Sequence, residues 1–299
     1  MRLLTGGIDD MENILEIRGL EKKFPDSTFS IHDINLSLPK GAIMGLIGEN
    51  GAGKTTLIRL ILNIYGRSGG KITAFDGLDN VKDEAAFKEA LGYVADEDFL
   101  YINATAAKTA KAFSYAFREW DDSIFRKYMD MWQIDTKKRC GELSKGMKTK
   151  VMLALALAHK PKLLILDEPT AGLDPAARIE MLDILREFVS DGEHSVLFST
   201  HITGDLDKVA DYIALMIDGH VHEVMSADEA QEKYAVVSGD TNTMHPELLI
   251  GAKLSGNVYE ALALRKDIPQ LGDVTVRTPN FEDILVHTIL RNRENRRKD

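Results

Sequence analysis

Residues 48–55 read Gly48-Glu49-Asn50-Gly51-Ala52-Gly53-Lys54-Thr55, which is the pattern G-x-x-x-x-G-K-T. The apolar run from Ala42 to Ile47 precedes this stretch, and Thr56 to Leu62 follow it with the spacing of a helix. A strand, a glycine-rich loop and a helix in this order predict a phosphate-binding loop. The glycines let successive backbone N–H groups point at an anion, and the N-terminus of the helix adds a partial positive charge. The sequence therefore predicts a protein that binds a nucleoside triphosphate.

Two side chains at the end of this loop have predicted roles in binding. Lys54 is expected to reach the β- and γ-phosphates, and the Thr55 hydroxyl is expected to take a place on Mg²⁺. The other loop residues that we expect to contact the nucleotide are Gly48, Asn50, Gly51, Gly53 and Thr56.

A second motif supplies carboxylates. The apolar run Leu163-Leu164-Ile165-Leu166 reads as a buried strand and ends in Asp167 and Glu168. Ligands of open α/β sheets sit at the carboxyl ends of the strands, so these two side chains are expected beside the phosphate loop. Asp167 is predicted to hold Mg²⁺ through its water shell, and Glu168 to polarise the attacking water as a general base.

Composition limits the class of protein. The 299 residues are enough for one large α/β domain with an appendage, or for two small domains. The net charge of −10 argues against nucleic acid as a direct partner. The single cysteine, Cys140, cannot form an internal disulfide, which fits a reducing cytosol. No stretch approaches the ~18 apolar residues of a membrane-spanning helix, so any work at a membrane is expected to need a partner.

Hydrophobic patterns divide the chain into three parts. The central strand-like runs are continuously apolar, which indicates a sheet covered by helices on both faces. Between Asp96 and Cys140 the strand signals vanish, and residues 104–120 and 123–132 read as amphipathic helices. After about Ala230 short strand signals return, followed by a helical pattern from Phe281 to Leu290. The predicted strands before Ala230 are residues 14–17, 42–47, 162–166, 195–198 and 212–216.

Leu143-Ser144-Lys145-Gly146-Met147 stands just before the helix that leads to the Asp167-Glu168 strand. This stretch resembles the signature motif of ABC-type ATPases, which is most often written L-S-G-G-Q. The third and fifth positions here are Lys145 and Met147, a form seen in bacterial subfamilies. Ser144 and Gly146, which the resemblance places at the γ-phosphate, are retained.

Further motifs resemble the same family in the same order, over about residues 14–225. Phe24 resembles the aromatic residue that stacks on adenine, and Ala171-Gly172-Leu173-Asp174 resembles the D-loop, so the resemblance implies that Phe24 and Asp174 also bind nucleotide. His201 resembles the switch histidine. A neutral imidazole nitrogen of His201 is expected to donate to the γ-phosphate and to orient the water that Glu168 activates.

The resemblance implies a fold and a domain division. The fold is an α/β P-loop NTPase of ABC type with a mixed sheet, a helical subdomain insertion and a small α+β appendage at the C-terminus. We expect a nucleotide-binding domain at residues 12–232, with the helical subdomain at about 96–150, and an accessory region at 233–299.

The chain departs from the family pattern at one Mg²⁺ position. Where the family usually carries a glutamine, the sequence reads Gly92-Tyr93-Val94-Ala95-Asp96-Glu97-Asp98. The aligned residue is Asp96, or Glu97 with a slip of one residue. A carboxylate here is expected to bind Mg²⁺ more strongly than an amide does. It also adds negative charge near the γ-phosphate when no metal is present, so hydrolysis is expected to depend more strongly on Mg²⁺.

In the family, two ATPase chains sandwich two ATP molecules head to tail, with Ser144 of one chain at the nucleotide held by Lys54 of the other. The resemblance therefore implies an ATPase that uses ATP and Mg²⁺, and pairs with a second copy of itself or a paralogous ATPase. It would power a transmembrane permease, docked near Asp96 to Tyr101, from the inner face of the cell membrane. The subfamilies that it looks like serve exporters of peptides, antimicrobials or toxic amphiphiles.

Two other classes stay open at this point. Soluble ABC ATPases act on ribosomes or DNA, but this chain lacks their second ATPase domain and coiled coil, and it is acidic. A nucleotide-sensing regulator that binds ATP without turnover is the other.

The C-terminal end is basic, from Arg291 to Asp299. It reads either as a solvated helix end or as a contact with acidic lipid or a partner. Phe281 to Val286 resemble the closing helix of many exporter ATPases, which suggests a docking element. The appendage is expected to brace the dimer, to regulate it or to cover a sheet edge.

Overall fold

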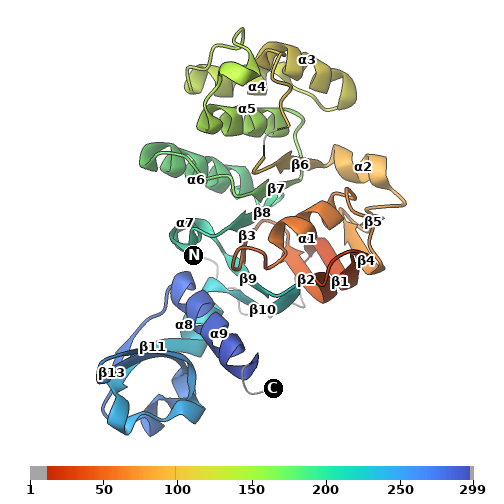
Figure 1. Ribbon diagram of the computed structural model, residues 1–299. Coiled ribbons are helices and arrows are strands. Elements are labelled where there is room, and N and C mark those ends of the chain that lie inside the picture. Colours follow the sequence, from red (N-terminus) through yellow and green to blue (C-terminus); the bar gives the residue numbers. More distant parts are fainter. Residues whose placement is uncertain (1–11, 98, 297–299) are drawn as a thin grey trace.

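The computed structural model describes residues 12–97 and 99–296, in which fourteen strands form three sheets (Figure 1). The strands are β1 (Asn13–Lys23), β2 (Ser30–Pro39), β3 (Ile43–Ile47), β4 (Gly69–Ala74), β5 (Leu78–Asp79), β6 (Leu91–Val94), β7 (Leu163–Asp167), β8 (Ser195–Thr200), β9 (Tyr212–Ile217), β10 (His220–Ser226), β11 (Tyr234–Asp240), β12 (Leu249–Ser255), β13 (Val258–Leu264) and β14 (Thr275–Arg277). The α-helices are α1 (Lys54–Ile61), α2 (Glu84–Glu89), α3 (Ala106–Ala116), α4 (Asp122–Met131), α5 (Lys145–Ala158), α6 (Pro175–Val189), α7 (Thr203–Val209), α8 (Ala227–Lys233) and α9 (Phe281–Arg296).

The central sheet has the order β10-β9-β3-β8-β7-β6 and is parallel except for β10. Its strands β3, β7, β8 and β9 are buried along their whole length, as their continuous apolar runs predict. Alternate side chains enter two different cores: Leu164 and Leu166 pack with α5 and α6, whereas Leu163 and Ile165 pack with α1. The two large hydrophobic cores of the molecule thus lie on the two faces of this sheet.

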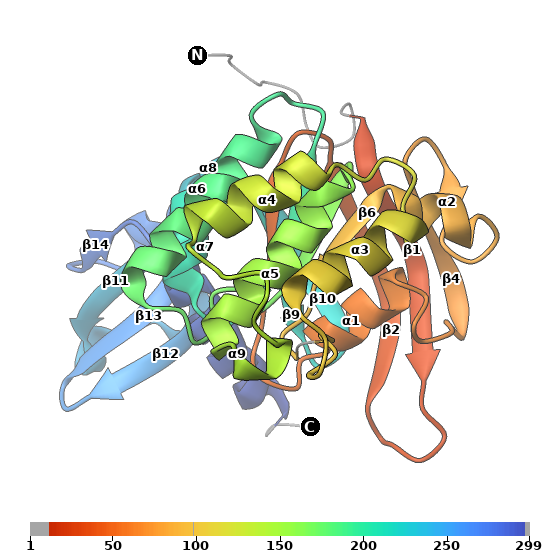
Figure 2. The same ribbon diagram turned by 90° about the horizontal axis from the view of Figure 1, so that it is seen from above.

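An antiparallel sheet with the order β2-β1-β4-β5 shares the core that contains α1. It lies on the opposite side of the molecule from the C-terminal sheet (Figure 2). The antiparallel strands β2 and β4 are absent from the sequence prediction, because their alternating apolar and polar residues give shorter signals than the buried parallel strands.

Helices α3, α4 and α5 form a layer that lies above β6 and β7 in the view of Figure 1. Each begins at a side chain that accepts a backbone N–H: Thr105 for α3, Asp121 for α4 and Ser144 for α5. Helix α6 begins in the same way at Asp174, with Pro175 in its first turn. The predicted α/β fold with a helical insertion is confirmed.

The C-terminal sheet has the order β12-β13-β11-β14 and is antiparallel. Tyr259 belongs to a small separate core between this sheet and neighbouring loops. Val236, Leu262 and the apolar face of α9 instead join the large core that contains α5 and α6. The appendage is therefore packed onto the body of the molecule. Within residues 12–97 and 99–296, no helix combines the length and apolar character that crossing a membrane requires.

The hydroxyl of Tyr259 gives a test of this packing. It is buried and has no hydrogen-bond partner among the residues that the structure describes. An unpaired buried hydroxyl carries a desolvation cost of about 1–3 kcal/mol, so Tyr259→Phe is expected to keep or raise the midpoint of thermal unfolding. Tyr259→Ala also removes the ring and is expected to lower stability by about 3–5 kcal/mol. A clear loss of stability in Tyr259→Phe would show that the hydroxyl does have a partner.

Candidate functional site

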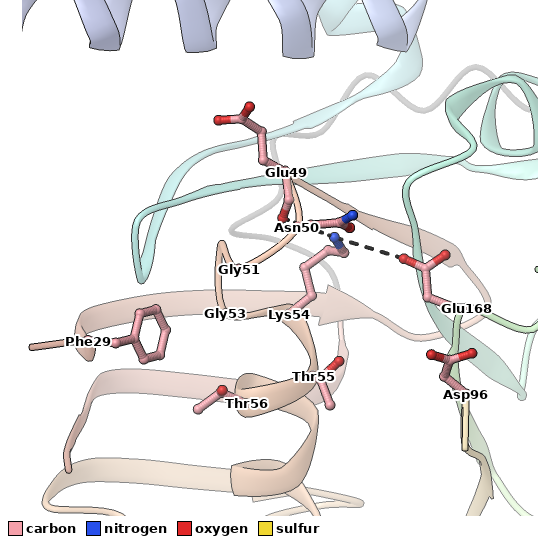
Figure 3. Close-up of a pocket in the computed structure, with 10 residues that line it drawn as sticks. All are labelled: Phe29, Glu49, Asn50, Gly51, Gly53, Lys54, Thr55, Thr56, Asp96 and Glu168. Carbon is pink, nitrogen blue, oxygen red and sulfur yellow. Dashed lines mark hydrogen bonds and ion pairs between the residues drawn. The ribbon is translucent and has the colours of Figure 1, made fainter. Parts of the chain in front are cut away.

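The glycine-rich loop joins β3 to α1 and borders a cavity of about 490 Å³ (Figure 3). Lys54 and Glu168 approach each other across this cavity from α1 and from the end of β7. The lining residues are Phe29, Glu49, Asn50, Gly51, Gly53, Lys54, Thr55, Thr56, Asp96 and Glu168.

Two glycines of the loop lie where no other residue fits. Gly53 has φ 108°, and a Cβ atom there would lie 2.8 Å from Met216 Cε and 2.9 Å from Phe29 Cζ. A Cβ atom on Gly48 would lie 2.3 Å from the backbone oxygen of Met216. The loop therefore packs directly on the end of β9. Gly51, with φ 84°, has open space around it.

The N-terminus of α1 fits an anionic ligand. Its N-cap residue is Gly53, which offers no side-chain cap, and its first turn contains no acidic residue. The first N–H groups of a helix have no partner within the helix, and here they open toward the cavity. An uncapped helix start, a left-handed glycine and a lysine at one cavity form a cradle for a polyphosphate.

Lys54 is held inside its own loop. Its side chain is only 8% exposed, and Nζ donates to the backbone oxygen of Gly48 at 2.8 Å. Glu168 Oε1 lies 3.9 Å from the same nitrogen. Burial lowers the pKa of Lys54, and the carboxylates of Glu168 and Asp167 oppose that shift. The ammonium group is thus positioned before any phosphate arrives.

Asp167 is the last residue of β7 and is almost fully buried. Its register partner in the neighbouring parallel strand is Ser199, whose Oγ donates to Asp167 Oδ1 at 2.5 Å. This contact fixes one oxygen of the carboxylate.

Glu168 follows in the left-handed region, with φ 51°, a conformation that a non-glycine residue adopts only at some cost. Its side chain is 13% exposed, and Oε2 accepts from the His201 backbone N–H at 3.2 Å. His201 Nδ1 lies 2.7 Å from the same oxygen.

The contact with Glu168 decides which nitrogen of His201 carries a proton. A carboxylate only accepts, so the Nδ1 of His201 is the donor. A neutral ring then has no second N–H at Nε2. For His201 to donate to a phosphate as well, the ring would have to be in the imidazolium form or to rotate.

Of the two sequence alternatives, Asp96 lines the cavity and Glu97 does not, so the predicted Mg²⁺ role fits the position of Asp96. Its Oδ1 accepts from Lys145 Nζ at 2.9 Å. Both side chains are about half exposed. Lys145 is the third residue of the signature-like stretch, so this ion pair ties the start of α5 to the loop that follows β6.

Phe24 is not among the lining residues. It lies in the loop between β1 and β2, packs edge-on to Tyr65 with ring centroids 5.7 Å apart, and has its ring centroid 6.4 Å from that of Phe29. Phe29 is the aromatic residue at the cavity, while the predicted role of Phe24 stays a prediction.

Ser144, Gly146 and Asp174 also do not line the cavity of their own chain. Ser144 and Asp174 accept backbone N–H groups at the starts of α5 and α6, and the Ala177 N–H contributes most to a lowered pKa of Asp174. Their predicted contacts with nucleotide require a second chain and stay predictions.

Among the described residues, no group of three or more His, Cys, Asp or Glu side chains is placed to hold a metal ion. The predicted ligands Thr55, Asp96 and Asp167 include only two carboxylates. Mg²⁺ usually binds through one or two carboxylates together with substrate phosphates and water, so this donor set fits a nucleotide-dependent Mg²⁺ site.

Phe29 and Glu49 are lining residues that sequence reasoning missed. Glu49 occupies a variable position of the phosphate-loop pattern, which therefore gives no signal for it. Phe29 lies in the same loop as Phe24, and the pattern alone does not choose between the two.

The sequence profile of the ABC transporter family matches residues 31–171. The chain is 31% identical to the ABC transporter ATP-binding protein YtrB of Bacillus subtilis, over 74% of this chain and 75% of that protein. It is 29% identical to the bacitracin transport ATP-binding protein BcrA of Enterococcus faecalis, over 75% and 72%. It is 31% identical to the lantibiotic transport ATP-binding protein SrtF of Streptococcus pyogenes, over 70% and 89%.

Solved structures agree with this likeness. CbiO1 of Clostridium perfringens, part of an ABC transporter complex, matches with a TM-score of 0.62 and 27% identity over 73% of this chain and 90% of that one. The ATP-binding cassette MJ0796, a dimer bound to ADP and phosphate, matches with a TM-score of 0.63 and 20% identity over 71% and 98%. At 20% identity the second match shows the fold alone.

The bond from Ser199 to Asp167 gives a test of the carboxylate site. Ser199→Ala removes a donor from a buried carboxylate and is expected to lower the free energy of unfolding by about 1.5–3 kcal/mol. It is also expected to weaken Mg²⁺-nucleotide binding severalfold. Ser195→Ala, at the other end of β8, is the control, since it removes a buried hydroxyl that accepts from Gly41 N. Equal effects of the two variants on binding, measured by titration calorimetry, would contradict the assignment.

Proposed function

Because the chain belongs to the ABC transporter ATP-binding family, we propose that it is the ATPase subunit of a bacterial exporter. An ATP-binding subunit of this family binds ATP with Mg²⁺, hydrolyses it, dimerises and works with a permease. The observation that carries the proposal is the cavity where buried Lys54 and Glu168 face each other at 3.9 Å beside an uncapped helix start.

We propose the following roles for the residues at the cavity. The loop from Gly48 to Thr56 holds the phosphates, and Lys54 contacts the terminal ones. Thr55, Asp96 and Asp167 would hold Mg²⁺, which when bound supplies charge neutralisation at the phosphate oxygens. Phe29 offers an apolar ring for the base at the rim.

Glu168 is the proposed general base. Its carboxylate is half enclosed by Lys54 on one side and by His201 on the other, which limits its rotation. A proton taken from water by Glu168 would stay on the Glu168 carboxyl, because the Nδ1 of His201 that lies at 2.7 Å already carries a proton and donates it. In this arrangement His201 orients the base first, and contacts the phosphate only after the ring is protonated or moves.

Ser144, Gly146 and Asp174 are proposed to act across the dimer. They lie outside the cavity of their own chain, and the N-terminus of α5 behind Ser144 is free of acidic residues in its first turn. A helix start of this kind fits a phosphate supplied by the second chain.

We propose that the permease docks beside the cavity, at the segment that follows Asp96. Three apolar side chains are exposed there: Phe99 by 46%, Tyr101 by 69% and Ile102 by 60%. Exposed apolar residues gathered on one loop fit an interaction site. This contact would place the protein at the inner face of the cell membrane. The matching domain division is residues 12–232 and 233–299, with the helical subdomain at about 96–150.

The substrate class is proposed from the relatives. BcrA is described as a bacitracin transport protein and SrtF as a lantibiotic transport protein. Export of a peptide antibiotic or a similar amphiphile is therefore the proposed task of the complete transporter.

Glu168→Gln tests the catalytic proposal. Loss of the base is expected to reduce ATP hydrolysis by at least about 100-fold while ATP binding remains. The trapped ATP is expected to convert the variant from monomer to dimer in sedimentation velocity. Adding Ser144→Ala to this variant is expected to weaken the dimer without affecting binding to the monomer. An ATP-bound protein that stays monomeric would mean that closure needs the permease or that Ser144 does not act across the dimer.

Asp96→Gln tests the unusual carboxylate. An amide lacks the negative charge that a carboxylate brings near the γ-phosphate when no metal is bound, so this variant is expected to flatten the dependence of hydrolysis on Mg²⁺ concentration. The variant also breaks the ion pair with Lys145, so Lys145→Ala is the matched control that keeps the carboxylate. If both variants change the Mg²⁺ dependence equally, the ion pair and not metal binding explains the effect.

A further inference from the structure

The last turns of α9 reach the phosphate loop. Arg293 Nη2 lies 2.5 Å from Glu49 Oε1, although the two residues are 244 positions apart in the chain. Glu49 is both a residue of the G-x-x-x-x-G-K-T stretch and a lining residue of the cavity. In Figure 3 its carboxylate points away from Lys54, toward the pale blue helix above the loop. The C-terminal helix thus contacts a residue that lines the cavity.

A second set of contacts links α9 to the loop through a turn. Asn292 Nδ2 donates to Asp218 Oδ2 at 2.9 Å, and Arg296 pairs with the same oxygen. Asp218 and Gly219 form the tight turn between β9 and β10, and Gly219 N donates to the Ala52 oxygen of the phosphate loop at 2.9 Å. The end of α9 therefore contacts the loop directly and through this turn.

The other end of α9 contacts the helix that follows His201 in the chain. Phe281 N donates to Asp207 Oδ1 at 2.9 Å. Asp207 lies on α7, which begins two residues after His201. A helix of 16 residues spans about 24 Å, so one helix of the appendage contacts both α7 and the phosphate loop.

The described arginines of the basic end pair with carboxylates of this chain. Arg291 pairs with Glu294 at 3.8 Å, and Arg293 and Arg296 pair with Glu49 and Asp218. Residues 297–299 lie outside the described part of the chain. The three arginines remain about half exposed, so the solvated end and the contact with acidic lipid or a partner both stay predictions.

The pairing of Glu49 with Arg293 matters for ligand binding because Glu49 carries a negative charge. A carboxylate at the rim repels the several negative charges of a polyphosphate, and a neighbouring guanidinium cancels that charge. The two side chains are 45% and 60% exposed, so the pair itself adds little to stability and is sensitive to salt. Its effect is expected in ligand affinity and not in folding.

We propose that Arg293 is a positioning residue of the nucleotide site. It neutralises and orients Glu49, and with Asn292 and Arg296 it holds the phosphate loop in the form that accepts a nucleoside triphosphate. Through α9, the C-terminal appendage senses and adjusts nucleotide binding. This inference rests on the proposed function of the site.

The test is ATP binding by the full-length chain, measured by titration calorimetry at low salt. Arg293→Ala is expected to raise the Kd for ATP about threefold to tenfold, with kcat at saturating ATP unchanged. Arg293→Lys is expected to restore most of the affinity. Glu49→Gln removes the repulsion, so adding Arg293→Ala to it is expected to change the Kd less than twofold. Arg291→Ala, which removes a cation of the same helix end, is the control and is expected to bind as wild type does.

The salt dependence of the Kd and the rate of amide hydrogen exchange test the same proposal independently. The difference between Arg293→Ala and wild type is expected to shrink at 0.5 M salt, where the Debye length is only about 4 Å. Without nucleotide, Arg293→Ala is expected to exchange the amide hydrogens of residues 48–53 faster than Arg291→Ala does.

The outcomes separate the inference from the function on which it rests. Equal Kd values for Arg293→Ala and Arg291→Ala, or a full loss of affinity that persists in the Glu49→Gln background, would overturn the inference. A wild-type protein that binds no ATP would instead overturn the proposed function, and the exchange comparison would still test the contact. Arg293→Lys and Glu49→Gln keep the test valid should Arg293→Ala fold poorly.

Discussion

The nucleotide site depends on one constraint, the burial of the Lys54 ammonium group against two carboxylates at the edge of a parallel sheet. A buried cation is tolerated only where partners satisfy it, and here they are the Gly48 carbonyl and the nearby Glu168. The strand register supplies this arrangement. Ile47 aligns with Thr200, and Asp167 aligns with Ser199, so the residues after each strand meet at the same level. The order of β3, β8 and β7 therefore brings the loop, His201 and both carboxylates together.

The same constraint explains which features the sequence predicts well. Strands buried on both faces must be continuously apolar, so β3, β7, β8 and β9 stand out. Helix starts need local caps, and α6 begins at residue types that favour such a start, Asp174 and Pro175. Gly48 and Gly53 lie against Met216, where a larger residue would clash. The phosphate loop therefore needs glycine at fixed positions, and these positions form a pattern that can be recognised in the sequence.

Features that depend on contacts between distant segments cannot be predicted from such local patterns. The half-exposed strands β2 and β4 lack a continuous apolar run. The pairing of Asp96 with Lys145 joins residues 49 positions apart, and that of Glu49 with Arg293 joins residues 244 apart. Each residue alone reads as an ordinary surface charge. Only the fold shows that these charges meet at one cavity, and that Phe29, more than Phe24, faces it.

These long-range ion pairs suggest how parts of the molecule respond to nucleotide. A ligand shifts a conformational equilibrium only through contacts that differ between two states. Asp96 and Glu49 both line the cavity, and each is paired with a cation from a separate unit: Lys145 from the helical layer and Arg293 from the appendage. A polyphosphate with Mg²⁺ brings new charge to both carboxylates. We therefore expect it to act on both ion pairs, so that the helical layer and the appendage respond to the same event through different contacts.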